Sequence, residues 1–294
     1  MSSTILQLLI NSLIAGAIYA LVASGFSLIY STNKFIHFAY GATIAFGAYI
    51  LYLFFNILGL SFGFAAVLTI AFTSFLGYVM NFFVYKQLRR RKTSSIILLI
   101  ASVGLLILLE SLILVLFGAG VKIIGFIKVS EGINIFGAMI TPLQIFIIIS
   151  SILLLVVISI FIKKTKLGKA MRSVSDNKDV SEIVGISSEK IYSLSFVIGS
   201  AIAGIAAILI GLEQNLEPTM GTNLMIKGFA AAIIGGIGSV RGAILGAFLL
   251  GIAENFGIWY LPSGYKDAIA FILLFIFLLF RPQGILGVKR RSDK

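Results

Sequence analysis

Residues 191–211 read IYSLSFVIGSAIAGIAAILIG and contain no charged side chain. A helix that crosses the hydrocarbon core of a bilayer needs about 20 predominantly apolar residues. The pattern predicts an all-α fold, a polytopic transmembrane helical bundle of about eight spans with broken or re-entrant helices, forming a single domain over residues 1–294. The other uncharged or nearly uncharged runs lie at 4–30, 38–58, 62–85, 94–118, 143–162 and 267–280, and a less regular Gly-rich stretch covers 228–260.

The composition excludes other broad classes of protein. Apolar residues make up 59% of the 294 positions and charged residues 12%, which leaves too little polar surface for a water-soluble globule of this length. The first apolar run is too long for a removable signal peptide and lacks its basic start, so we expect it to be retained as a helix. The absence of cysteine from the sequence excludes disulfides, thiolate metal sites and cysteine nucleophiles.

Basic residues are concentrated in three short stretches between or after the apolar runs. The net charge is +12, and most of the 23 Lys and Arg fall in 86–92, 163–190 and 281–294. Cytoplasmic loops of membrane proteins carry such an excess, so we expect these stretches inside the cell, the N-terminus outside and the C-terminus in the cytoplasm. The same cations favour contact with anionic lipid head groups, and we expect no nucleic-acid partner.

The segment 163–190, KKTKLGKAMRSVSDNKDVSEIVGISSEK, is the one substantial polar segment of the sequence, and we name it the elbow. Asp176 is a candidate helix N-cap, and Gly185 suits the left-handed residue that follows a helix. Between them lies an apolar face at helical spacing. We therefore predict a short amphipathic helix, whose apolar face consists of Val180, Ile183 and Val184.

Ser187 is a candidate cap of a further helix, with Glu189 in its first turn, where a negative charge favours the helix dipole. The apolar face of the elbow has no partner in water. It must lie on lipid, on its own chain, or in a groove of another protein. The pattern leaves these three alternatives open.

Two stretches, 31–47 and 227–242, interrupt the hydrophobic pattern. Irregular backbone at membrane depth survives where protein or a water-filled cavity satisfies its polar groups, and paired interruptions can mark a substrate path. Close helix packing explains them equally well. The glycines of the second stretch either permit a sharp backbone break beside a pore or allow a close crossing, and 228–260 is either a re-entrant pair of half-helices or two short spans. These glycines are Gly235, Gly236 and Gly238.

Small residues four apart let helix backbones approach closely, within one chain or between subunits. Two such pairs are Ser200 with Gly204 and Gly242 with Gly246.

Two carboxylates lie within apolar runs, where an ionisable group costs at least about 2.5 kcal/mol unless it faces the interior of the bundle. Glu110 and Glu254 are therefore functional candidates, or else polar contacts that hold helices together. The cations that flank the Gly-rich break, Lys227 and Arg241, are expected to extend towards opposite membrane surfaces.

The sequence offers no enzyme site. A phosphate-binding G-x-x-x-x-G-K-[ST] loop is absent, since Gly168-Lys169 is followed by Ala170. The single histidine, His37, cannot assemble a zinc site without cysteines or neighbouring carboxylates, and a Ser-His-Asp hydrolase would need that same residue. We expect no catalytic residues, no metal site and no cofactor.

Four blocks of sequence resemble the branched-chain amino acid (Liv-type) permeases of bacterial ABC transporters. The run LGKAMRSVSDNKDVSEIVGI with FVIGSAIAGIAAILIG is similar to the coupling-loop region of that family. FIHFAYGATIAFGAY is similar to its early Asn-Phe-Ala-His-Gly block. AAIIGGIGSVRGAILGAFLLGIAEN is similar to its late Gly-rich block, and RPQGILG to its ending.

The resemblance implies an inner-membrane permease subunit that carries branched-chain amino acids. It would work with a second permease subunit, two ATP-binding subunits and an extracytoplasmic binding protein. The elbow would then be a cytoplasmic coupling loop that docks on an ATP-binding subunit. ATP hydrolysis belongs to that partner, and ATP binding there would switch the permease between outward and inward states. The docking residues would be Gly168, Arg172, Asp176 and Gly185.

The sequence departs from the family pattern at three positions. His37 stands where the family has Asn, Tyr40 where it has His, and Glu110 where Gln is usual, so the cargo could differ. A permease for urea or short amides is one alternative, and an ion-coupled secondary amino acid transporter is another. The candidate translocation path consists of His37, Tyr40, Glu110, Gly235, Gly236, Gly238 and Glu254.

Overall fold

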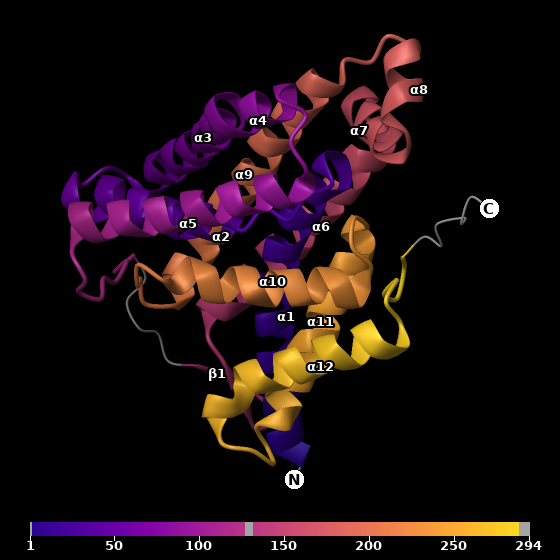
Figure 1. Cartoon of the computed structure of the whole chain (residues 1–294). Coiled ribbons are helices and arrows are strands. Elements are labelled where there is room, and N and C mark those ends of the chain that lie inside the picture. Colours follow the sequence, from indigo (N-terminus) through magenta and orange to yellow (C-terminus); the bar gives the residue numbers. More distant parts are fainter. Residues whose placement is uncertain (1, 127–131, 288–294) are drawn as a thin grey trace. The chain divides into compact units, whose positions relative to one another are not determined.

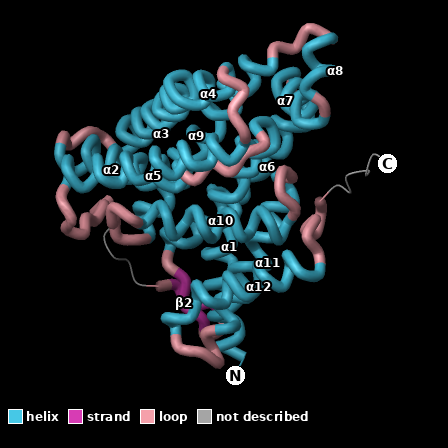
Figure 2. The backbone as a smooth tube through the Cα atoms, in the orientation of Figure 1, coloured by secondary structure: helices cyan, strands magenta, loops and turns pink. Residues whose placement is uncertain are grey.

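The computed structural model describes residues 2–126 and 132–287 (Figure 1). Within these residues the fold is helical apart from one short antiparallel hairpin, β1 (Ile133–Ile135) with β2 (Ala138–Ile140) (Figure 2). The all-α prediction is confirmed. The helices are α1 (Ser2–Asn33), α2 (Ala39–Tyr52), α3 (Phe62–Met80), α4 (Lys86–Arg90), α5 (Ser95–Phe117), α6 (Pro142–Lys164), α7 (Lys166–Asp176), α8 (Lys178–Ile183), α9 (Ser188–Glu213), α10 (Met220–Gly235), α11 (Val240–Gly257) and α12 (Lys266–Phe280).

Eight helices among the described residues are long and apolar enough to cross a bilayer, as the sequence predicts. Two of them include a π-helical segment: η1 (Leu53–Ile57) extends α2, and η2 (Asn81–Tyr85) joins α3 to α4. The Gly-rich stretch forms α11, which has spanning length, and the end of the shorter α10. Whether the stretch is a re-entrant pair of half-helices or two short spans stays a prediction.

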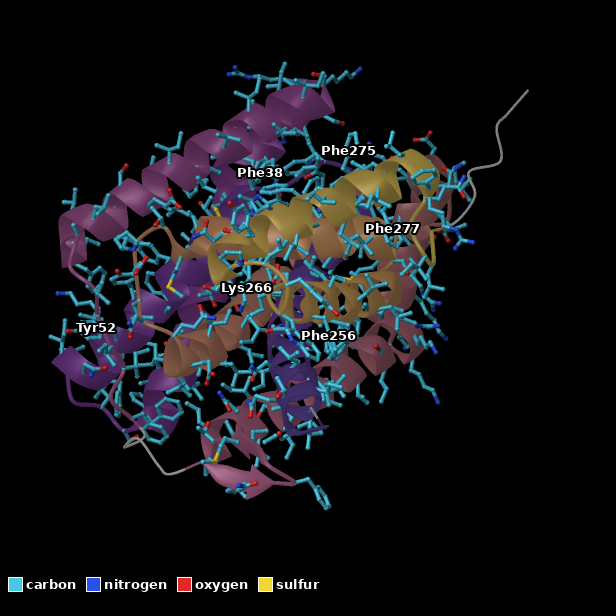
Figure 3. All side chains as sticks on the ribbon, turned by 90° about the horizontal axis from the view of Figure 1, so that it is seen from below. Phe38, Tyr52, Phe256, Lys266, Phe275 and Phe277 are labelled. Atoms are coloured by element: carbon cyan, nitrogen blue, oxygen red, sulfur yellow. The ribbon has the colours of Figure 1, made fainter. Side chains whose placement is uncertain are left out.

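The outward surface of α12 is apolar, as expected of a helix that faces lipid. Figure 3 shows the side chains along this helix, including Phe275 and Phe277. Phe275 is 62% exposed and Phe280 80% exposed. Water would penalise such a surface, whereas lipid acyl chains are as apolar as these side chains. The chain is a multi-pass membrane protein.

The described residues divide into two compact units. The first takes residues 2–27, 132–156 and 226–287, and the second takes 28–126 and 157–225. Three helices, α1, α6 and α10, contribute residues to both units. A single domain over 1–294 stays a prediction.

The core of the second unit forms where α2 and α3 pack against α9. Small residues allow this approach. A Cβ at Gly77 would collide with Ser200, and a Cβ at Gly204 would collide with Thr73. The Ser200–Gly204 pair therefore serves packing within the chain.

The core of the first unit contains a tight turn between α10 and α11. The backbones of Gly235 and Gly242 meet there, and Gly246 lies against the carbonyl of Ala231. Gly236 and Gly238 have φ of +113° and +89°, which L side chains rarely adopt. The structure thus has both a close crossing and a sharp backbone break at these glycines, and a position beside a pore stays a prediction. The Gly242–Gly246 pair also packs within the chain.

The segment after α12 closes the C-terminal end of α10. Ile285 N donates to the carbonyl of Ile234 at 2.9 Å, and Leu286 N donates to the carbonyl of Gly235 at 2.8 Å. The last carbonyls of a helix have no partner within it, so these bonds satisfy two of them. The RPQGILG block therefore has a structural role, which is to cap the C-terminal end of α10. The basic residues at 289–294 lie outside the described residues.

Candidate functional site

The elbow folds into α7 and α8, each with its own N-cap. Thr165 Oγ1 accepts a hydrogen bond from Gly168 N at 2.9 Å, and Asn177 Oδ1 accepts one from Val180 N at 3.0 Å. The prediction of Asp176 as the N-cap is wrong by one residue. Asp176 ends α7, because the extended backbone of Asn177 suits the cap.

The predicted left-handed stop at Gly185 is confirmed. Its φ is +85°, and no atom lies within 4 Å of the position that a Cβ would take. The glycine is therefore required by backbone conformation and not by space. Ser187 does precede α9, with Glu189 in its first turn, but the Ser187 side chain makes no capping bond.

The apolar face of the elbow is exposed. Val180 is 54% exposed, Ile183 83% and Val184 66%. Ser181 lies on the opposite, buried side and shares a 2.7 Å hydrogen bond with Ser173. An exposed apolar ridge on an otherwise polar loop is typical of a docking surface.

The four predicted coupling residues occupy different environments. Gly168 is buried, and a Cβ there would collide with the backbone of Phe161 and Ile162, so its role is to permit close packing. Arg172 is exposed and donates to the carbonyl of Lys163 at 3.2 Å. Asp176 and Gly185 are also exposed.

His37 lies in the linker between α1 and α2, fully buried among aromatic rings of the second unit. Its Nδ1 is 2.9 Å from Tyr85 Oη and 3.4 Å from Ser102 Oγ, while Nε2 has no hydrogen-bond partner among the described residues. Burial lowers the pKa of His37 to about 3, so the ring is neutral at physiological pH. The hydroxyl of Tyr40 is likewise buried without a described partner.

Glu110, on α5, is half-buried and accepts a hydrogen bond from Thr222 Oγ1 at 2.5 Å. Thr222 lies in the first turn of α10. A short bond to a carboxylate is strong. The pair joins two helices of the second unit, which is the packing role that the sequence left open for Glu110.

Glu254, on α11, belongs to a polar cluster of the first unit. Its carboxylate is buried, accepts a 2.7 Å hydrogen bond from Tyr19 Oη, and lies 3.4 Å from Lys227 Nζ. The ammonium also lies 3.1 Å from Asp267 Oδ1. Lys227 thus bridges a buried carboxylate and an exposed one, and its extension towards a membrane surface stays a prediction. Arg241 is exposed.

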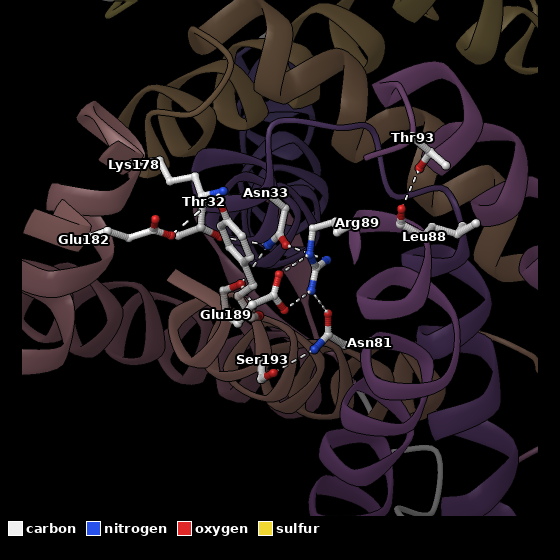
Figure 4. Close-up of polar contacts among 12 residues, drawn as sticks. Thr32, Asn33, Asn81, Leu88, Arg89, Thr93, Lys178, Glu182, Glu189 and Ser193 are labelled. Atoms are coloured by element: carbon white, nitrogen blue, oxygen red, sulfur yellow. Dashed lines mark hydrogen bonds and ion pairs between the residues drawn. The ribbon is translucent and has the colours of Figure 1, made fainter. Parts of the chain in front are cut away.

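A cluster around Arg89, near the end of α4, is not predicted from the sequence (Figure 4). Arg89 Nε and Nη2 each lie 3.1 Å from an oxygen of Glu189, in the first turn of α9. Nη2 also donates to Asn81 Oδ1 at 2.7 Å, and Nη1 donates to Asn33 Oδ1 at 3.4 Å. The guanidinium lies 4.8 Å from the centre of the Tyr192 ring. These five residues form the Arg89 cluster.

The seven candidate path residues divide between the units. His37, Tyr40 and Glu110 belong to the second unit; the others belong to the first. Their participation in a translocation path stays a prediction. The residues of the first unit are Gly235, Gly236, Gly238 and Glu254.

Comparison with known proteins gives matches along almost the whole chain. The family described as "Branched-chain amino acid transport system / permease component" matches residues 8–278. The high-affinity branched-chain amino acid transport system permease protein BraD of Pseudomonas aeruginosa is 36% identical, over 96% of this chain and 95% of that protein. LivH of Escherichia coli, which carries the same description, is 32% identical over the same shares.

A solved structure shares the fold. The structure titled "PsaBC from Streptococcus pneumoniae in complex with Fab" matches with a TM-score of 0.52 and 16% identity, over 93% of this chain and 91% of that one. At this identity the likeness concerns the fold alone.

Proposed function

The chain belongs to the family of branched-chain amino acid transport permease components, and from this premise we propose that it forms the membrane pathway of an ATP-driven importer for hydrophobic, branched-chain amino acids. The pathway would operate by alternating access in the cytoplasmic membrane. A second permease subunit, two ATP-binding subunits and an extracytoplasmic binding protein would complete the transporter. The N-terminus would lie outside, and the elbow and the C-terminus in the cytoplasm, as the distribution of cations indicates.

The exposed apolar face of the elbow is the observation that carries the proposal. A helix of six residues with Val180 and Ile183 exposed suits a groove on a partner protein. Lipid suits it less well. Helices that lie on anionic membranes carry Lys and Arg on their polar face, whereas α8 carries one Lys and two acidic residues. We therefore assign the face to an ATP-binding subunit.

The environment of the intramembrane carboxylates supports an ATP-driven importer over an ion-coupled transporter. An ion-coupling site needs a carboxylate that can exchange a proton or a sodium ion. Glu254 is instead paired with Lys227, and Glu110 accepts a short bond from Thr222. These contacts suit structural roles.

Reconstitution tests the function directly. The chain, its second permease subunit, the ATP-binding subunits and the binding protein are placed in liposomes, and uptake of labelled leucine is measured. Uptake should require ATP and persist when a protonophore collapses the proton gradient. Gradient-driven uptake without ATP would contradict the assignment. Preference for urea or acetamide over leucine would move the chain to the amide-carrying alternative.

Docking of the elbow is tested separately by co-purification with the ATP-binding subunit. Ile183→Asp or Val180→Asp should weaken the interaction, because a charge would enter an apolar groove. Val121→Asp is the matched control, since Val121 is 54% exposed, like Val180, but lies outside the elbow. Equal retention of the subunit by all three variants would contradict docking through this face.

A further inference from the structure

Arg89 ties together three segments that are far apart in the sequence. Its guanidinium contacts Asn33 at the end of α1, Asn81 at the start of η2 and Glu189 in the first turn of α9. The elbow ends at residue 190, within the first turn of α9. The elbow belongs to the second unit, and its connection to α9 runs through the turn that Arg89 holds.

The contact differs from an ordinary surface ion pair. Only 12% of the Arg89 side chain is exposed, and its planar fork meets both oxygens of Glu189. A two-pronged guanidinium–carboxylate contact fixes orientation as well as distance. The ring of Tyr192, one turn further along α9, lies against the guanidinium. Rotation of α9 about its own axis would break all of these contacts together.

The two asparagines extend the connection along α9. Asn81 Nδ2 donates to Ser193 Oγ at 2.8 Å, and Asn33 Nδ2 donates to Ser195 Oγ at 2.9 Å. Each amide thus accepts from Arg89 with its oxygen and donates to α9 with its nitrogen. The Arg89 cluster and these serines hold the first two turns of α9.

The contacts are not equally tight. Arg89 donates to Asn81 at 2.7 Å but to Asn33 at 3.4 Å, a length at which a hydrogen bond is weak. The α3–α9 interface is also closely packed, through Gly77 and Gly204. Arg89 therefore binds Asn81 more firmly than Asn33, and close packing adds to the connection between α9 and α3.

We propose that Arg89 is the positioning residue of transport coupling. By fixing α9 to η2 and α4, it makes these helices one rigid arm, so that movement of the elbow reaches the arm instead of being lost by rotation at the start of α9. The proposal rests on the proposed function, since it takes the ATP-binding subunit as the source of that movement. The role assigned to Arg89 is to position α9, and not to bind ATP or the transported molecule.

A distance measurement on the isolated chain tests the rigid joint without any transport assay. The sequence has no cysteine, so spin labels on Ile183→Cys and Gln87→Cys, both exposed positions of the second unit, would be unique. Arg89→Gln should broaden the distance distribution between the labels. Arg91→Gln, a change at an exposed neighbour, should leave it narrow. If Arg89→Gln does not fold, Glu189→Gln takes its place. An unchanged distribution in the folded variant would overturn the proposal.

The reconstituted transporter tests coupling. Arg89→Gln should retain the ATP-binding subunit and its ATP hydrolysis, but transport several-fold less leucine per ATP. Arg89→Lys should give an intermediate ratio, because lysine keeps the charge but not the fork. The exchange of Arg89→Glu with Glu189→Arg should restore the ratio, since the Asn81 and Asn33 amides can turn to donate instead of accept.

A purely structural role predicts a different result: assembly, hydrolysis and uptake would fall together, and the ratio would not change. That outcome would overturn the proposal. A wild-type transporter without ATP-driven uptake would instead refute the proposed function, and the label distances would still decide whether Arg89 fixes the joint.

Discussion

Replacement of Lys227 by methionine should destabilise the first unit by about 3–5 kcal/mol, the cost of leaving a buried charge without its partner. Glu254 has 1% of its side chain exposed, and Lys227 Nζ is the cation within 3.4 Å of its carboxylate among the described residues. Methionine has nearly the length of the lysine stem, so the change removes the charge with little change in packing. Tyr19 would still donate to Glu254, but one neutral donor does not balance a full charge.

Two comparison variants separate this effect from general disturbance. Asp267→Asn removes the other carboxylate near Lys227, but Asp267 is 66% exposed, and an exposed ion pair contributes about 0–1 kcal/mol. The double variant Lys227→Met with Glu254→Gln removes both buried charges and keeps an acceptor for the Tyr19 hydroxyl. It should regain most of the stability that the single variant loses, as expected for residues in direct contact.

The single tryptophan supplies the assay. Trp259 lies directly after α11 in the first unit, so its fluorescence during denaturation in mixed detergent micelles reports on this unit alone. From most to least stable, the expected order is wild type, Asp267→Asn, the double variant and Lys227→Met. If Lys227→Met is as stable as wild type, or the double variant is no more stable than the single one, the buried pair does not carry the energy assigned to it.

Four further predictions concern three glycines and the buried histidine. Gly246→Leu should lower the free energy of unfolding by at least about 1–3 kcal/mol, because the new side chain would collide with Ala231. Gly104→Ala should raise it by about 0.5–1 kcal/mol, because the space around Gly104 is open. Thermal unfolding followed by circular dichroism checks both predictions. Gly185→Ala should cost about 1–2 kcal/mol of left-handed strain and weaken co-purification of the ATP-binding subunit, with Gly185→Asn nearer wild type. The pKa of His37 in the folded chain, about 3, lies below the usual value of 6.5, so between these pH values the unfolded chain binds a proton that the folded chain does not. The free energy of unfolding should therefore fall as the pH drops below 6.5, by about 2 kcal/mol at pH 5. His37→Gln should abolish this dependence in unfolding midpoints compared at pH 7 and pH 5.

The sequence predicts the spans and the local signals of the elbow well, because both depend on neighbouring residues. Hydrophobic runs alone define the helices, and Gly185 follows from the need to end a short helix. The wrong prediction of Asp176 as the N-cap, in place of Asn177, has a local cause too. Both side chains can cap a helix, so the sequence does not decide which backbone is extended.

Contacts between side chains that lie far apart in the sequence cannot be predicted from such local patterns. Lys227 lies far from Tyr19 in the sequence, and their meeting depends on how α1 packs against α10. In the run KQLRRRK, nothing local distinguishes Arg89 from its neighbours Arg90 and Arg91. The π-helical turn of η2 and the packing of α9 select which arginine meets Glu189.

The two interruptions of the hydrophobic pattern look alike in sequence, but different interactions hold them in place. The first is a linker that starts with Lys34, a non-glycine residue at φ +58°, and continues into a helix whose Ala39 N–H is satisfied by Ser102 Oγ at 3.1 Å. Side chains therefore hold it in place. The second turns through two glycines at positive φ and is closed by backbone bonds from the segment after α12. Substitutions in the second turn should therefore cost most at its glycines and at Ser239, whose Oγ caps α11 by accepting a bond from Gly242 N at 3.2 Å. The first linker depends on the side chains that surround His37.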